Sequence, residues 1–241
     1  MSKEPDNELI VVSNRVPSPK SSGGSQGGLA VGVMNALQKN EGLWVGWSGD
    51  IDENRDAQLN HYEFDSVRFA TFPLTENDHQ TFYVGFSNEV LWPLFHYRTD
   101  KVEYTRENLE GYLRVSQRYA RHVSTLVEPH SRIWVHDYQL IPLGHYLRQA
   151  GIDVPIGHFL HTPFPPWDVL RILPDYEDLL RYFSAYDVIG FQTKCDQRNF
   201  EECMRHGLEA TFHDDGTIEA EGRRFRAEAY PISIDVESAQ E

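Results

Sequence analysis

The chain has 241 residues, and its 22 Lys and Arg residues against 37 Asp and Glu residues give a formal net charge of −15. Hydrophobic residues make up 40% and charged residues 24%, a composition typical of globular proteins that excludes disorder as the dominant state. The negative charge disfavours nucleic acid and anionic lipid as partners but still allows a local positive pocket for a phosphate.

The cysteine pattern and the apolar runs predict the compartment. Cys195 and Cys203 are eight residues apart in a segment with helical spacing, about 12 Å along a helix, which is too far for a disulfide. No apolar run is long enough to span a bilayer, and the polar N-terminus does not resemble a signal peptide. The expected location is therefore cytoplasmic, with no membrane partner.

The first predicted unit is a strand, a Gly-rich loop and a helix. Residues 1–8 are expected to be a disordered lead-in, and Leu9 to Val12 predict a strand that is buried on both faces. The loop at 18–28 could hold an anion at the N-terminus of the helix that follows, or could be a plain surface loop. Its glycine spacing matches neither a dinucleotide fingerprint nor a P-loop.

Short apolar strands and helices alternate over the rest of the chain. Helices are expected at 76–96, with Thr75 as N-cap and a break near Pro93, and at 105–127, with Thr105 as N-cap. The remaining predicted strands are 44–47, 67–72, 133–135, 156–160, 188–191 and 225–230, and the remaining helices end near Gln149 or span 175–183 and 196–204. This alternation predicts an α/β fold with a mostly parallel, twisted sheet and helices on both faces.

Polar side chains follow several of these strands, at the edge where parallel sheets bind ligands. Arg15 follows the first strand; it could fork onto a phosphate or pair with a surface carboxylate. His136 and Asp137 follow a later strand, and Asp137 could accept from sugar hydroxyls, act as a base, or cap a turn. No further His or Cys stands at a zinc-ligand spacing beside them.

His161 follows the next strand and precedes Thr-Pro-Phe-Pro-Pro. Three prolines stiffen this backbone, which favours a positioned functional histidine over the alternative of a satisfied buried one.

An aromatic segment lies within the predicted helix at 76–96. Tyr83 and Trp92 are the candidates for stacking on a sugar face, since amphipathic rings suit that role. The other large apolar side chains of the segment are expected in the core: Phe82, Phe86, Leu91 and Phe95.

Seven sequence blocks, in order, resemble the N-terminal half of the trehalose-6-phosphate synthase family over about residues 9–235. The blocks are Val-Val-Ser-Asn-Arg-Val (11–16), Gly-Gly-Leu-Ala-Val-Gly (27–32), Leu-Trp-Val-Gly-Trp-Ser-Gly (43–49), Phe-Ser-Asn-Glu-Val-Leu-Trp-Pro (86–93), His-Tyr-Arg (96–98), Trp-Val-His-Asp-Tyr (134–138) and Phe-Leu-His-Thr-Pro-Phe-Pro (159–165).

The resemblance implies a retaining glycosyltransferase of the two-Rossmann-domain (GT-B) type, with no metal and no other cofactor. Such enzymes transfer glucose from a nucleotide sugar, usually UDP-glucose, to glucose 6-phosphate. The acceptor hydroxyl attacks from the same face, guided by the donor phosphate, without a protein nucleophile. The acceptor lies mainly on the N-terminal domain and the donor mainly on the C-terminal one.

Matching motif positions imply a role for each site residue. The acceptor site would comprise Arg15 on the phosphate, with Trp47, Tyr83, Trp92 and Asp137 lining the pocket. The donor site would comprise Gly27 and Gly28 against the diphosphate and His161 against the transferred sugar. Asp137 and His161 are the implied catalytic residues.

The resemblance also predicts the domain organisation of the chain. Residues 9–235 are expected to form the acceptor-binding domain and 236–241 to begin the interdomain segment, with the C-terminal donor domain absent. Because that domain carries the cations that stabilise the leaving diphosphate, the isolated chain is expected to have little or no transferase activity. A second copy or the missing domain could be a partner.

Two alternatives stay open at this point. The first is a related synthase that uses glycerol 3-phosphate or a cyclitol phosphate as acceptor. The second is a non-catalytic sugar-phosphate-binding regulatory module.

Overall fold

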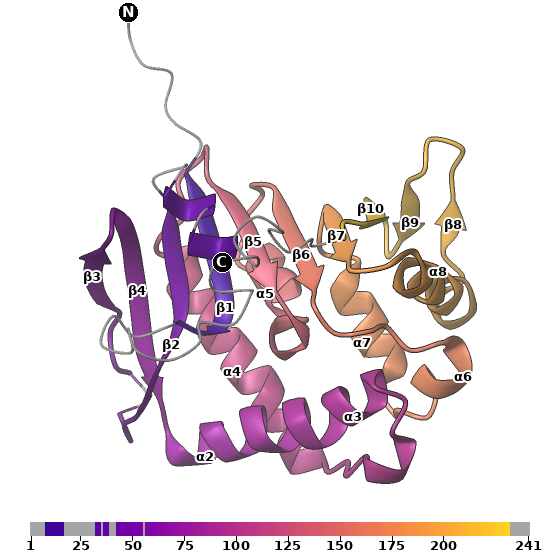
Figure 1. Cartoon of the computed structure of the whole chain (residues 1–241), viewed down its shortest axis with the longest axis horizontal. Coiled ribbons are helices and arrows are strands. Elements are labelled where there is room, and N and C mark those ends of the chain that lie inside the picture. Colours follow the sequence, from indigo (N-terminus) through magenta and orange to yellow (C-terminus); the bar gives the residue numbers. More distant parts are fainter. Residues whose placement is uncertain (1–7, 17–31, 35, 39–41, 55, 232–241) are drawn as a thin grey trace, which may run out of the picture.

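The computed structural model describes residues 8–16, 32–34, 36–38, 42–54 and 56–231. They form a ten-stranded sheet whose order is β3-β4-β2-β1-β5-β6-β7-β10-β9-β8 (Figure 1). The strands are β1 (Leu9–Arg15), β2 (Leu43–Ile51), β3 (Asn60–Phe64), β4 (Val67–Leu74), β5 (Arg132–His136), β6 (Ile156–Leu160), β7 (Val188–Phe191), β8 (Thr211–Phe212), β9 (Ile218–Ala220) and β10 (Arg223–Ala229).

The centre of the sheet is parallel, as the sequence predicts. Each neighbouring pair from β4 through β2, β1, β5, β6 and β7 to β10 is parallel. Three strands that the sequence analysis did not predict, β3, β8 and β9, join the two ends of the sheet in antiparallel pairs. The predicted α/β fold with a mostly parallel sheet is confirmed.

The direction of winding reverses between β1 and β5. From β1 the chain adds β2 and then β4 on one side, and it returns to add β5, β6 and β7 on the other. Val12 pairs with Val135, so the two central strands end side by side. Open α/β sheets bind ligands at such a reversal, in the crevice beyond the carboxyl ends of the strands.

The helices form a layer on the sheet and a bar along one of its edges (Figure 1). They are α2 (Glu76–Asp78), η2 (His79–Leu91), α3 (Trp92–Phe95), η3 (Thr99–Lys101), α4 (Arg106–Ser124), η4 (Tyr138–Leu140), α5 (Leu143–Gln149), α6 (Trp167–Leu170), α7 (Tyr176–Phe183) and α8 (Lys194–Leu208). The predicted caps are confirmed: Thr75 accepts from the Asp78 N–H and Thr105 from the Asn108 N–H.

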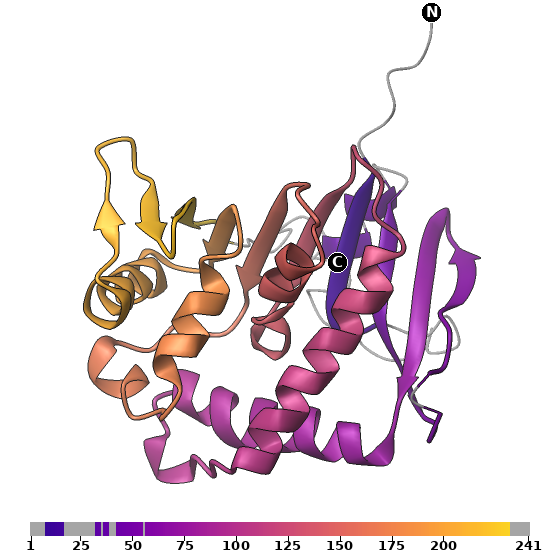
Figure 2. The same ribbon diagram turned by 180° about the vertical axis from the view of Figure 1, so that it is seen from behind.

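Both faces of the sheet carry helices. Helices α4, α5 and α7 cover one face (Figure 2), and the helical residues 32–34 and 36–38 lie on the other. Strand β1 shows why both faces must be covered, because Ile10 and Val12 pack into the larger core cluster while Val11 packs into the smaller one. Burying a large aliphatic side chain stabilises the fold by about 2 kcal/mol.

One continuous helical stretch, 76–95, runs along the edge where β1, β5 and β6 end (Figure 1). Residues 79–91 have the wide turn of a π-helix. π-Helical turns are rare in proteins, and those that occur often lie at functional sites. The predicted break near Pro93 is wrong. Proline cannot donate to the carbonyl four residues earlier, on Glu89, but that carbonyl accepts from the Glu103 N–H instead.

The core predictions for this stretch are confirmed, since Phe82, Phe86, Leu91 and Phe95 are each at most 2% exposed. The two cysteines both lie on α8, where Cys195 is exposed and Cys203 is buried. Within the part of the chain that the structure describes, no helix combines the length and apolar character needed to cross a membrane.

Candidate functional site

The candidate residues gather at the carboxyl edge of the sheet. Arg15 ends β1, Asp137 and His161 directly follow β5 and β6, and the helical stretch along this edge supplies Tyr83 and Trp92. Gly27 and Gly28, the predicted donor contacts, lie outside the described residues.

Arg15 lies against the ring of Trp47. Its guanidinium carbon lies 5.5 Å from the centroid of the Trp47 ring. Trp47 is buried, its Nε1–H donates to the Asp50 carbonyl at 2.7 Å, and its ring centroid is 6.0 Å from that of Tyr83. Among the described residues Arg15 forms no ion pair. A cation–π contact holds the guanidinium without neutralising it, so its N–H groups stay available for an anion.

Gly49 leaves the space in which Arg15 lies. A Cβ atom at this position would be 2.6 Å from Nη2 of Arg15, and the backbone φ is +92°, which side chains other than glycine rarely adopt. Gly49, the glycine of Trp-Ser-Gly, thus leaves room for the Arg15 guanidinium.

Asp137 has a backbone conformation that is nearly confined to glycine, with φ of +69° and ψ of 174°. Its Oδ1 accepts from the Tyr138 N–H at 3.1 Å and from the His161 N–H at 3.3 Å, so it does cap the turn, as one alternative predicted. Burial raises the pKa of its carboxyl to about 6. A strained residue whose carboxyl has a perturbed pKa is typical of functional sites.

The helical stretch links Asp137 to the Arg15 group. Burial raises the pKa of Tyr138, and the charges of Asp137 and Tyr83 raise it further. The Tyr138 hydroxyl donates to Oδ1 of Asn88 at 2.9 Å. The edge therefore combines a cation, a carboxylate and aromatic faces, the groups that bind a phosphorylated sugar.

Trp92 lies at the other end of the stretch. Its ring is 46% exposed and stacks on His96 with centroids 4.1 Å apart.

His161 contacts a second histidine. Its Nε2 lies 3.0 Å from Nδ1 of His136, and burial lowers the pKa of His161 to about 4, so it is neutral at pH 7. Within the described ranges, no three His, Cys, Asp or Glu side chains are grouped so that they could hold a metal ion.

Four residues at this edge had no role in the sequence predictions: His79, Asn88, His96 and His136. The pairs His79–Tyr83 and Trp92–His96 have the i, i+4 spacing that places side chains together on a helix. That spacing could have indicated His79 and His96.

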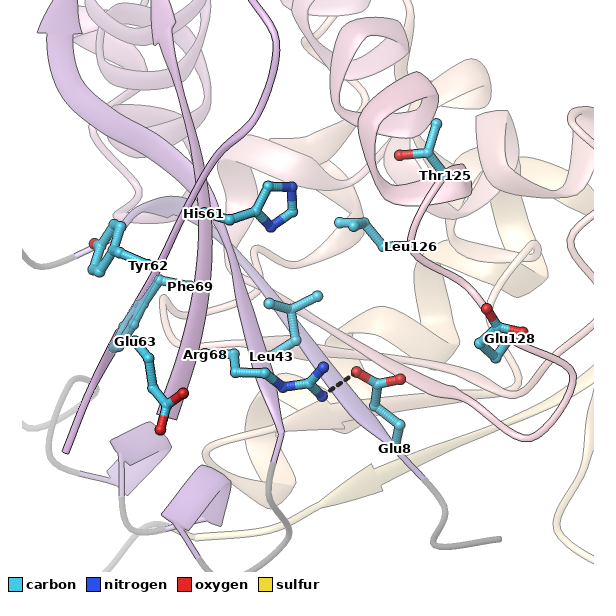
Figure 3. A pocket seen from close by; sticks show the side chains of 10 residues that line it. All are labelled: Glu8, Leu43, His61, Tyr62, Glu63, Arg68, Phe69, Thr125, Leu126 and Glu128. Carbon is cyan, nitrogen blue, oxygen red and sulfur yellow. Dashed lines mark hydrogen bonds and ion pairs between the residues drawn. The ribbon is translucent and has the colours of Figure 1, made fainter. Parts of the chain in front are cut away.

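A separate cavity of about 470 Å³ lies at the amino ends of the strands (Figure 3). Arg68 pairs there with Glu8, and Glu63 and Glu128 also line it. These carboxylates disfavour an anionic ligand, and the cavity is at the opposite edge from Arg15 and Asp137.

Comparison with known proteins agrees with this geometry. The family model described as glycosyltransferase family 20 matches residues 7–241. The trehalose-6-phosphate synthase of Cronobacter sakazakii is 45% identical over 229 residues, which are 95% of this chain and 48% of that protein.

Two solved structures are also similar. The α,α-trehalose-phosphate synthase (UDP-forming) of Burkholderia vietnamiensis is 45% identical with a TM-score of 0.91, over 96% of this chain and 50% of that one. The corresponding synthase of Burkholderia xenovorans, in complex with glucose-6-phosphate, is 43% identical with a TM-score of 0.86, over 94% of this chain and 50% of that one. The chain spans about half the length of the curated relatives it matches. It belongs to glycosyltransferase family 20.

Proposed function

We propose that this chain is the acceptor-binding half of a trehalose-6-phosphate synthase, which transfers glucose from UDP-glucose to glucose 6-phosphate with retention of configuration. The observation that carries the proposal is that a cation and a carboxylate both lie at the carboxyl edge, on either side of the winding reversal. Arg15 ends β1, and Asp137 directly follows β5, the neighbouring strand. The family membership and the glucose-6-phosphate complex of the Burkholderia xenovorans relative support the same acceptor.

Each group has a role that suits its chemistry. Arg15 donates to the acceptor phosphate through two N–H groups, and the ionised Asp137 accepts from sugar hydroxyls. Tyr83 and Trp92 offer aromatic faces to the sugar ring. His161, neutral at pH 7, contacts the transferred glucose.

Retention needs no nucleophilic side chain in this scheme, since the acceptor hydroxyl attacks from the face that the leaving phosphate occupies. Stabilising the charge that develops on a leaving diphosphate is a large part of such catalysis. The residues proposed for that task belong to the half of the relatives that this chain does not match. We therefore expect the isolated chain to bind glucose 6-phosphate without transferring glucose.

Calorimetry with glucose 6-phosphate tests the proposal. Arg15→Ala should weaken binding about 10- to 100-fold, because charge-assisted hydrogen bonds contribute roughly 1.5–3 kcal/mol. Arg106→Ala is the matched control, because Arg106 is an exposed arginine whose one ion pair among the described residues is with Glu110, in the next turn of α4. It should leave binding unchanged.

Glycerol 3-phosphate and inositol phosphate, titrated in the same way, distinguish the acceptor. Tighter binding of either ligand than of glucose 6-phosphate would overturn the acceptor assignment. Binding of none of the three would overturn the site.

A further inference from the structure

His161 has a role in the proposed function, but His136, the histidine that it contacts, has none. His136 ends β5 and is 1% exposed, and His161 follows β6, the neighbouring parallel strand. Nδ1 of His136 lies 3.0 Å from Nε2 of His161, and the two rings are nearly stacked, with 25° between their planes.

Aromatic neighbours fix both rings. The Trp134 ring centroid is 4.3 Å from that of His136, and the Phe159 ring centroid is 4.7 Å from that of His161. Residues two apart on a strand point to the same face of a sheet, as Trp134 and His136 do on β5. Phe159 pairs with His136 and lies two residues before His161, so all four rings lie on one face. The pair is therefore held in one geometry before any ligand binds.

Only one proton can lie between the two nitrogens, and either ring can supply it. If His161 donated through Nε2, His136 would carry its own proton on its Nε2. That Nε2 is fully buried and has no hydrogen-bond partner among the described residues. A buried N–H without a partner is rarer in proteins than a buried acceptor without one. The favoured arrangement therefore has His136 donating through Nδ1–H, with its Nε2 unprotonated.

Burial keeps both rings neutral. Desolvation and the proximity of His161 and His158 lower the pKa of His136 well below its usual value, and burial lowers that of His161. Each ring thus holds a single proton at pH 7, as the hydrogen-bond assignment requires.

We propose that His136 is a positioning residue whose Nδ1–H donates to Nε2 of His161 and fixes His161 as the Nδ1–H tautomer. His161 is half-buried, and its Nδ1 has no partner in the described part of the chain. It then offers a neutral N–H donor, rather than an acceptor, to an oxygen of the bound sugar. The last step rests on the proposed function, whereas the tautomer itself does not.

Nitrogen NMR of the ¹⁵N-histidine-labelled chain, without ligand, tests the assignment. The His161 resonances, identified by their loss in His161→Gln, should show a protonated Nδ1 and an unprotonated Nε2 at pH 7. A protonated Nε2 in the wild-type chain would overturn the proposal.

Two substitutions separate positioning from a general structural role. His136→Leu removes the donor, so Nε2 of His161 should become protonated in a detectable fraction of molecules. His136→Asn keeps an N–H donor near the position of Nδ1 and should restore the wild-type tautomer. His158→Leu, a buried histidine of β6 outside the pair, should leave the His161 signals unchanged.

An unchanged tautomer in folded His136→Leu would contradict the proposal. If that variant does not fold, the wild-type and His136→Asn spectra decide. Because no substrate is present, failure of glucose 6-phosphate to bind this chain would leave this result intact and overturn the proposed function alone.

Discussion

Replacing Asp137 with asparagine should increase stability at neutral pH while it weakens ligand binding. The carboxyl is held by backbone N–H groups in a strained turn, and burial raises its pKa to about 6. An ionised carboxylate in that position is costly to the fold, and we infer that its negative charge is retained for the ligand. The asparagine side chain would keep one acceptor oxygen for the N–H groups but would never ionise.

The magnitude follows from the pKa. The value rises from 3.8 to about 6, a difference that corresponds to roughly 3 kcal/mol. Because the pKa of the Asp137 carboxyl is higher in the folded chain than in the unfolded one, the protonated carboxyl contributes fully to the free energy of unfolding below pH 3.8. That contribution is lost as the pH rises through 6. The unfolding free energy of Asp137→Asn minus that of the wild type should therefore increase by about 2.5 kcal/mol between pH 4 and pH 7.5.

Urea denaturation of both proteins across this pH range measures the difference, and the titration of other groups largely cancels between them. Calorimetry at pH 7.5 should show weaker glucose 6-phosphate binding by the variant, about 5- to 10-fold for the loss of charge assistance. A stability difference that does not change with pH would refute the raised pKa. Wild-type affinity in Asp137→Asn would refute the role of the carboxylate.

Three further predictions concern Gly49, His158 and the activity of the chain. Gly49→Ala should displace the Arg15 side chain and weaken glucose 6-phosphate binding in calorimetry. Gly151→Ala is the control, because Gly151 also has a positive φ but faces open space; it should reduce stability by a similar amount and leave the affinity unchanged. Burial lowers the pKa of His158 to about 3, so its contribution to stability is complete above pH 6.5 and is lost on acidification. Between pH 7 and pH 5 the free energy of unfolding of the wild type should therefore fall by roughly 2 kcal/mol more than that of His158→Leu, as measured by urea denaturation. Mixed with UDP-glucose and glucose 6-phosphate, the isolated chain should release no UDP in a coupled assay, and steady turnover would contradict the division of roles between the two halves.

Much of the fold could be predicted because its signals are local. Strand β1 opens with the apolar run Leu-Ile-Val-Val, and the side chains of Thr75 and Thr105 cap two of the helical stretches. Strand β3, Asn-His-Tyr-Glu-Phe, was missed because it is an edge strand with a polar, mostly exposed sequence. Strands β8 and β9 were missed because they are only two and three residues long. The π-helical turn of 79–91 leaves no mark in apolar spacing that could be separated from that of an α-helix.

The site divides in the same way. Arg15, Asp137 and His161 could be singled out because each follows a strand, and strand ends share one edge of a parallel sheet. The contact between His136 and His161 could not be predicted, since it depends on the register of β5 against β6. The dependence of Arg15 on Gly49 arises likewise from a close approach that only coordinates can show.

A crystal structure of the chain soaked with glucose 6-phosphate would show directly where the acceptor binds. We expect phosphate density against the Arg15 guanidinium and sugar hydroxyls within hydrogen-bond distance of the Asp137 carboxylate, between the ends of β1 and β5. Density elsewhere, such as in the amino-edge cavity beside Arg68 and Glu8, with both Arg15 and Asp137 left without ligand, would contradict the proposed acceptor site.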